Sequence, residues 1–89
     1  MERSTTRRCG GGKLVKVTVR AQGRTIEDIR ITGDFFTHPE GTIEALEGKL
    51  VGMGRGQIGG AVRGVLGGGN LVIGFNADEL ILMIEECLR

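Results

Sequence analysis

The chain has 89 residues and a net charge of +1, with 39% hydrophobic and 26% charged residues, a composition typical of one small folded domain. Three Phe residues are its only aromatics, which argues against a stacking platform for single-stranded nucleic acid. No apolar run approaches the roughly 20 residues that span a bilayer, and no signal-peptide core follows Met1. We therefore expect a cytoplasmic protein.

Residues 1–12 are polar and basic and end in three glycines. Because they carry too little apolar surface to fold, we interpret them as a flexible basic arm ahead of a single domain at 13–89. A basic arm can contact nucleic acid, so an independent nucleic-acid-binding or protein-interaction module is an open alternative. That alternative predicts an affinity for RNA or DNA that falls steeply with salt.

Two segments show the period-2 pattern of half-buried strands. Residues 13–20 alternate valine with polar side chains, and residues 25–32 follow after a short turn, which predicts a β-hairpin. Ile26 is out of phase with the later isoleucines. This predicts a bulge near Glu27-Asp28.

A glycine-aspartate corner, Gly33-Asp34, ends the hairpin, and Phe35-Phe36 follow it. Strand alternation predicts that one of the two aromatic rings enters the core while the other points to the opposite face. The exposed ring would be the more informative of the two, because exposed apolar surface marks interaction sites.

Three helical segments are expected after this corner. Thr37-x-x-Glu40 has the form of a capping box and predicts a helix that ends at Gly52. Residues 52–69 contain nine glycines in 18 positions, so we expect only a short, weak helix there, or a loop that becomes helical when packed. Asn76, with a glutamate three residues later, predicts the start of a C-terminal amphipathic helix.

The apolar run at 71–75 is predicted to be a short strand that joins the hairpin. The element order therefore favours an α+β fold: a small antiparallel sheet, made of the hairpin plus a third short strand, with helices packed on one face.

The candidate reactive groups do not form a recognisable active site. Cys9 and Cys87 lack CxxC spacing, and with His38 they are too few for a zinc site, so we expect no metal, one free tail thiol and one buried thiol. His38 has the residue type of a general base and Asp34 that of an acid, but no nucleophile is positioned beside them. A self-contained small enzyme is therefore disfavoured. The match to GxGxxG at 54–59 follows a predicted helix instead of a strand, which argues against a nucleotide loop.

A combined pattern runs through residues 11–52. It consists of Gly12-Lys13-Leu14 opening a strand, an isoleucine-rich strand running into Gly33-Asp34-Phe35-Phe36, then Pro39-Glu40, and Leu46-Glu47 with Leu50 and Gly52. This pattern resembles the C-terminal accessory domain of lipoate–protein ligase. The glycine-rich stretch at 52–69 has no match in that pattern.

In that family the accessory domain is fused behind a catalytic domain or occurs as a separate small subunit in some archaea. This chain has no room for a catalytic domain, so it is similar to the separate subunit. The resemblance implies an α+β fold and a heterodimer with a catalytic subunit that holds lipoate and ATP with Mg, makes lipoyl-AMP and lipoylates a lysine of a lipoyl domain. It implies that this chain alone binds no cofactor and supplies no catalytic residue.

Two sets of site residues follow. The predicted partner contacts are Phe35, Phe36, Arg55 and Ile58, because an exposed aromatic side chain is a typical interface anchor. The residues expected nearest the shared substrate are Lys13, Asp34 and His38. Lys13 belongs to the Gly-Lys-Leu opening of the resemblance, and a lysine beside flexible glycines can reach an anionic phosphate.

Overall fold

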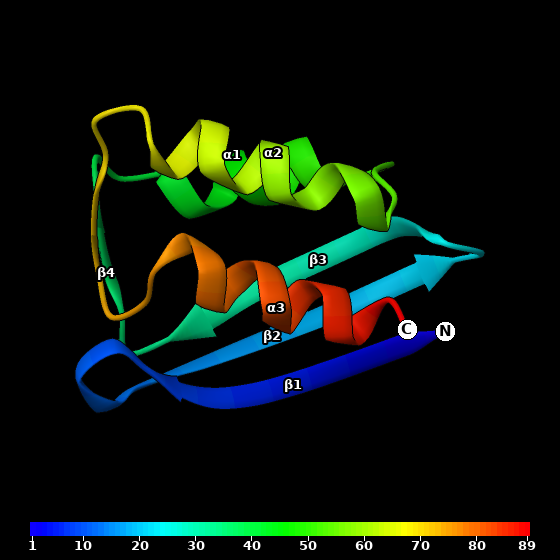
Figure 1. Ribbon diagram of the computed structural model, residues 1–89, viewed down its shortest axis with the longest axis horizontal. Helices are drawn as coiled ribbons and strands as arrows, with labels where there is room; N and C mark the ends of the chain where they lie inside the picture. The colour runs from blue at the N-terminus through cyan, green and yellow to red at the C-terminus, as the bar shows by residue number, and fades with distance from the viewer.

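The computed structural model describes the backbone of residues 1–89 and the side-chain surroundings of every residue except Gly11. Figure 1 shows the order of the elements. The strands and helices are β1 (Glu2–Cys9), β2 (Lys13–Gln22), β3 (Thr25–Gly33), β4 (Phe36–His38), α1 (Thr42–Leu50), α2 (Arg55–Leu66), β5 (Leu71–Ile73) and α3 (Ala77–Cys87). A short 3-10 turn, Gly10–Gly12, joins β1 to β2.

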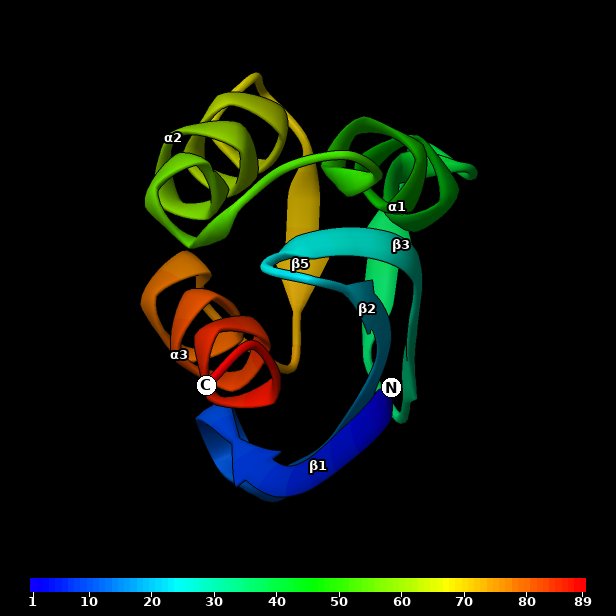
Figure 2. The same ribbon diagram turned by 90° about the vertical axis from the view of Figure 1, so that its right-hand side faces the viewer.

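The main sheet is antiparallel and has the order β1-β2-β3. Val15, Val17 and Val19 of β2 are fully buried beneath the helices. α1 packs on β3, α3 packs on β1 and β2, and α2 lies against both other helices. Figure 2 shows all three helices on one side of the curved sheet. The α+β class with helices on one face is therefore confirmed.

The predicted β2–β3 hairpin and its bulge are both confirmed. Arg20 pairs with Asp28 and the next residue, Ala21, pairs with Ile26, so Glu27 is the extra residue of the bulge. The bulge shifts the alternation of β3 by one residue. Ile26 consequently reaches the core beside Ile29 and Ile31 and is 1% exposed, although it is out of phase with them in the sequence.

The prediction of a flexible arm at residues 1–12 is wrong. Glu2–Cys9 form strand β1, which pairs with β2 over its whole length. The arm was inferred from a shortage of apolar side chains, but backbone pairing with the central strand needs none. The two threonines in the middle of β1, Thr5 and Thr6, also favour an extended backbone. The alternative of an independent nucleic-acid-binding module therefore loses its mobile basic arm.

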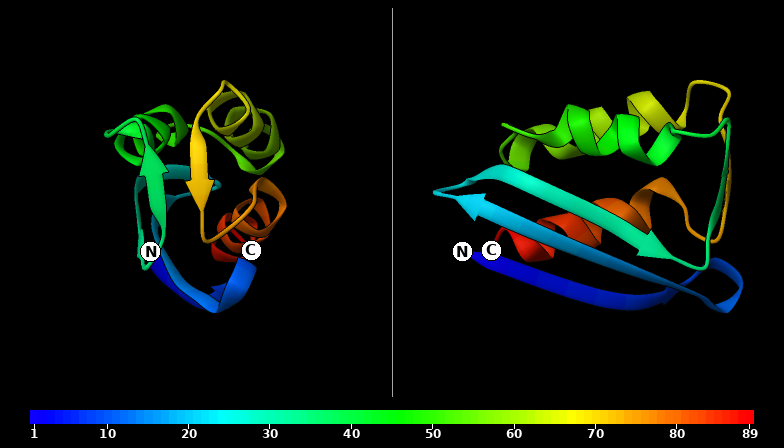
Figure 3. Two further views of the ribbon diagram at one scale, coloured as in Figure 1. Left: turned by 90° about the vertical axis from the view of Figure 1, so that its left-hand side faces the viewer. Right: turned by 180° about the vertical axis from the view of Figure 1, so that it is seen from behind.

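The third strand of the main sheet is β1, so the expectation that residues 71–75 would join the hairpin is also wrong. β5 pairs instead with β4 in a separate two-stranded antiparallel sheet. At the corner after β3, Gly33 adopts a positive φ of 151°, and a Cβ at this position would overlap the Leu14 carbonyl oxygen. The chain turns away from the main sheet here, and β4 and β5 lie side by side across one end of the molecule (Figure 3).

The helix starts were predicted with mixed success. The predicted capping box of Thr37 and Glu40 is wrong, because Thr37 belongs to β4 and the first helix begins at Thr42, after Gly41. Gly52, with φ of 86°, follows the end of that helix as predicted. At the start of α3 the capping box of Asn76 and Glu79 is confirmed, with backbone-to-side-chain bonds of 2.8 and 3.0 Å.

The glycine-rich stretch contains a full helix, α2, of 12 residues. Ile58, Ala61 and Val62 are buried on one side of it. Burial of this apolar stripe between α1 and α3 offsets the low intrinsic helix propensity of its glycines, each of which costs about 1 kcal/mol relative to Ala. None of the helices among the described residues is long and apolar enough to cross a membrane.

Candidate partner interface

The outer face of the β4–β5 ribbon exposes three large apolar side chains. Phe36 lies directly opposite Ile73, and His38 lies opposite Leu71, so these four residues share one face of the ribbon. Phe36 is 55% exposed, Ile73 51% and Leu71 50%. Clustered exposed side chains of this size on a small domain mark an interaction surface. We call these three apolar residues the ribbon face.

The other side of the ribbon is anchored to the core. Thr37 and Val72 alternate inward between the exposed residues, and Val72 packs against the core. Phe35 turns inward, with its ring edge-on to the buried ring of Phe75 at a centroid distance of 5.1 Å. The prediction that one Phe enters the core and the other points away is confirmed. Because Val72 and Phe35 pack against the core, the ribbon is held in place and Phe36 projects outward from it.

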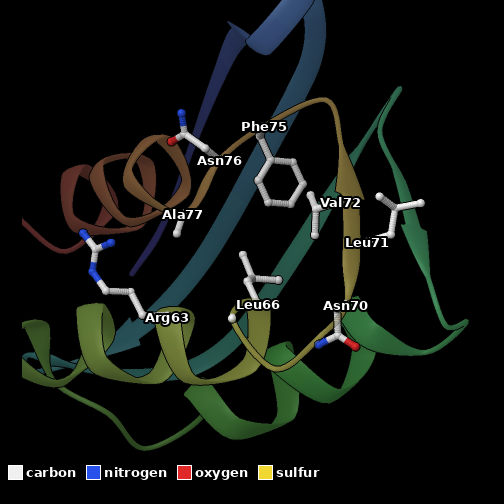
Figure 4. A pocket seen from close by; sticks show the side chains of 9 residues that line it. Arg63, Leu66, Asn70, Leu71, Val72, Phe75, Asn76 and Ala77 are labelled. Atoms are coloured by element: carbon white, nitrogen blue, oxygen red, sulfur yellow. The ribbon is translucent and has the colours of Figure 1, made fainter.

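A pocket of about 540 Å³ lies behind the ribbon, between the end of α2, β5 and the start of α3. Figure 4 shows Val72, Phe75 and Leu66 pointing into it while Leu71 points away to the opposite side of β5. Arg63, at its rim, is ion-paired with Asp78. The lining is thus mostly apolar, and the charged group at its mouth already has a partner.

Two of the residues predicted to lie near substrate meet at the corner beside the ribbon. The Asp34 N–H donates to the Leu14 carbonyl at 2.9 Å, which places Asp34 next to the start of β2. A Cβ on Gly74 would lie 3.4 Å from the Lys13 Cβ and 2.8 Å from the Phe35 Cβ. Lys13 is exposed and takes part in none of the three ion pairs that the described residues form. Its ammonium group is therefore exposed and has no ion-pair partner among the described residues.

His38, the third residue predicted to lie near substrate, is not part of this corner. It lies at the far end of β4, opposite Leu71. It lies four positions after Asp34, which corresponds to roughly 13 Å along an extended chain. The structure thus brings Lys13 and Asp34 together and leaves His38 exposed on the outer side of the ribbon.

The two cysteines have no role at the ribbon. Both are 3% exposed, so the expectation that Cys9 is a free tail thiol is wrong: as part of β1 it packs beneath α3, 4.0 Å from the Met83 sulfur. Burial raises the pKa of each thiol, and the carboxylates of Glu79 and Glu86 raise the pKa of Cys9 and Cys87, respectively, further. Within the part of the chain whose side chains are described, no three acidic, histidine or cysteine residues gather into a candidate metal site.

Comparison with known proteins identifies the family of this chain. No family model matches the chain. Lipoate-protein ligase A subunit 2 of Thermoplasma acidophilum is 35% identical over 68 residues, which cover 76% of this chain and 72% of the relative. This chain belongs to the lipoate–protein ligase A subunit 2 family. A solved structure agrees: a chain from an archaeal lipoylation system, described as a bipartite lipoate protein ligase and its E2 lipoyl domain from T. acidophilum, superposes with a TM-score of 0.78 at 30% identity. That match covers all of this chain and 98% of the other.

Besides Phe35 and Phe36, the residues predicted to contact the partner subunit are Ile58 and Arg55. Ile58 is 0% exposed in the core, so its assignment as a partner contact is wrong. Arg55 is exposed but begins α2 at the end remote from the ribbon (Figure 1), beside Arg24 and Arg89. Because α2 is about 18 Å long, Arg55 and Phe36 do not belong to one compact patch.

Leu71 and Ile73 are the residues of this ligase-family surface that sequence reasoning missed. They were predicted to belong to a short strand that joins the hairpin, and a short apolar run does not reveal which of its faces is covered. The signal was present in the run Leu-Val-Ile, where a strand beside only one layer of structure must expose alternate residues. Knowledge of the pairing with β4 was needed to use it.

Proposed function

We propose that this chain is the non-catalytic accessory subunit of a two-component lipoate–protein ligase. With a separate catalytic subunit it supports ATP-dependent activation of lipoate to lipoyl-AMP and transfer of the lipoyl group to a lysine of a lipoyl domain. Lipoate and ATP, with Mg, bind to the catalytic subunit. We also propose the cytoplasm as the location, since the reaction consumes ATP.

The observation that carries this proposal is the ribbon face in a chain of the subunit 2 family. Three half-exposed apolar side chains, Phe36, Leu71 and Ile73, sit on a ribbon whose other side is fixed to the core. A rigid apolar cluster of this kind has the properties of an interface hot spot, where a few anchors carry most of the binding free energy. In a ligase made of two chains, the catalytic subunit is the partner that this face fits.

The reactive side chains of this chain support an accessory role. The only serine, Ser4, is paired with Thr18 in the main sheet, and both cysteines are buried. The only histidine, His38, lies on the outer side of the separate ribbon. Nucleophilic catalysis needs a nucleophile within hydrogen-bond reach of a base, and these groups sit on elements that do not pair with one another. The contribution of the chain is therefore a surface, with the exposed Lys13 at the corner beside it.

The test is a reconstitution with purified components. The catalytic subunit is incubated with ATP, Mg²⁺, lipoate and an apo lipoyl domain, with and without this chain, while lipoyl-AMP formation and lipoylation are measured separately. We expect lipoyl-AMP only when both subunits are present and no product from this chain alone. Full adenylation by the catalytic subunit alone would refute the accessory role. Product from this chain alone would refute its non-catalytic character.

A further inference from the structure

Strand β1 forms an open margin of the main sheet. It is the terminal strand in the order β1-β2-β3 and pairs only with β2. Figure 1 and the right-hand view of Figure 3 show no element along its far side. An edge strand of eight residues is a ready template for pairing with another strand.

The hydrogen-bond pattern identifies the groups that face outward. Met1 and Ala21 exchange two bonds across the β1–β2 pair, of 2.8 and 3.1 Å. Because such pairs alternate along an antiparallel ladder, the odd-numbered residues of β1 bond to β2 and the even-numbered ones direct N–H and C=O away from it. The outward residues are Glu2, Ser4, Thr6 and Arg8. Within the described chain, no hydrogen bond is recorded from these four backbone positions on the outward side.

The opposite margin of the same sheet is closed. The Ile31 N–H of β3 donates to the Glu47 carboxylate at 2.7 Å. Ile26 donates to the Met53 carbonyl at 2.9 Å and accepts from Gly52 at 2.7 Å. The fold thus covers one edge with α1 and the residues after it and leaves the other unpaired. This asymmetry distinguishes β1 from an ordinary protected edge.

We propose that β1 pairs in antiparallel fashion with β1 of a second copy of this chain, about a two-fold axis at Thr5, to form a continuous six-stranded sheet. Only registers that oppose even-numbered residues can satisfy the outward groups. In the register centred on Thr5, Glu2 of each copy faces Arg8 of the other, and Ser4 faces Thr6. Every outward residue is paired, and the two outermost pairs combine opposite charges. A shift by two residues leaves Glu2 or Arg8 without a counterpart.

The other face of the paired strands tolerates this register. On this face, the register centred on Thr5 places Arg3 of one copy opposite Arg7 of the other, which is a like-charge pair. Arg7, however, is bound to the Glu86 carboxylate at 2.8 Å, and Arg3 donates to the Arg89 carbonyl at 2.5 Å. These acceptors, one on α3 and one just after its end, reduce the repulsion between the two guanidinium groups.

The self-complementary charge pattern is the reason for assigning a second copy as the occupant. A two-fold interface uses the same strand on both sides, so an acidic residue at one end must match a basic residue at the other. β1 meets this condition with Glu2 and Arg8 at equal distances from Thr5. This pairing does not depend on the proposed ligase role, since it uses the backbone groups of β1 and none of the residues of the ribbon face.

The first test is the oligomeric state of the full chain, measured by sedimentation velocity over a range of concentrations. We expect a monomer–dimer equilibrium. Thr6→Pro removes one outward N–H without touching the bonds to β2, and edge strands tolerate proline there. It should weaken the dimer by about tenfold or more, with an unchanged circular dichroism spectrum. Thr6→Ala, which keeps the N–H, is the matched control and should still dimerise. A monomeric wild-type chain, or a dimer indifferent to Thr6→Pro, would overturn the proposal.

A charge-reversal experiment tests the register itself. Glu2→Arg alone and Arg8→Glu alone each place like charges opposite one another at both ends of the interface, so each variant should be a weaker dimer than wild type. In an equimolar mixture of the two variants, both ends again combine opposite charges, and heterodimers should form. If the mixture stays as dissociated as its components, the register is refuted. Hydrogen exchange of the outward β1 N–H groups separates the two possible partners. If the catalytic ligase subunit, and not a second copy of this chain, protects these N–H groups from exchange, the β1 edge belongs to that subunit and self-pairing is refuted.

Discussion

Replacement of Phe36 by Ala tests whether the ribbon face binds the catalytic subunit. A Phe side chain offers on the order of 200 Å², and 55% of Phe36 is exposed, so a partner can cover roughly 110 Å² of it. At about 25 cal/mol per Å² this corresponds to nearly 3 kcal/mol. Because Ala retains the Cβ, we expect Phe36→Ala to cost about 2 kcal/mol of association free energy, or roughly 30-fold in Kd.

Isothermal titration calorimetry of the chain against the catalytic subunit measures this change directly. Leu82→Ala is the matched control: Leu82 is 50% exposed, as apolar as the ribbon residues, but lies on α3. It should leave Kd within about twofold of wild type. Phe35→Ala is the opposite control. That side chain packs on Phe75 inside the domain, so its removal should lower the free energy of unfolding, by about 2–4 kcal/mol.

The reasoning fails if Phe36→Ala binds with wild-type affinity while Leu82→Ala weakens the complex. The partner would then lie over the helices instead of the ribbon. Thermal unfolding of Phe36→Ala must accompany the titration, because the interpretation requires an intact domain. A Tm close to wild type is expected, since Phe36 contributes to the exposed face and does not belong to the buried core.

Three further predictions follow from single features of the fold. If Lys13 approaches ATP or the adenylate, Lys13→Ala should slow lipoyl-AMP formation by the assembled ligase about tenfold or more, while transfer from pre-made lipoyl-AMP changes less; an unchanged adenylation rate would restrict this subunit to a binding role. Gly33→Ala should destabilise the domain by at least about 1–3 kcal/mol in denaturant titrations, because φ is 151° and a Cβ would overlap a main-chain carbonyl. Gly48→Ala, in open space on α1, should instead stabilise it by about 1 kcal/mol; equal effects of the two substitutions would contradict this geometry. Stability should fall as the pH rises above about 8.5, because unfolded thiols then ionise while burial raises the pKa of Cys9 and Cys87 in the fold, and a variant lacking both thiols should lose most of this slope.

Local pattern was enough to predict several elements correctly. Alternating valines predicted β2, and the phase error at Ile26 predicted the bulge that the structure places at Glu27. The Asn76 cap of α3 was also evident, since its partner Glu79 lies only three residues away. Each of these features depends on residues within about one turn or one hairpin of each other, where spacing along the chain and distance in space are nearly equivalent.

The candidate interface required the tertiary structure. Phe36 could be predicted as one of two alternating rings, but Leu71 and Ile73 join it only because β5 pairs with a strand 33 residues or more earlier in the chain. Ile58 shows the reverse: helical spacing identified an apolar stripe, yet only packing against neighbouring elements decided that it faces inward.

The amino-acid sequence by itself determined the hairpin, the corner at Gly33 and the family pattern around Phe35 and Phe36. Only the tertiary structure decided that residues 2–9 complete the main sheet and that β4 and β5 form a separate ribbon. The reason is that strand pairing is carried by backbone N–H and C=O groups, which every residue except proline shares. Side-chain periodicity reports which way a strand faces but not which strand lies beside it.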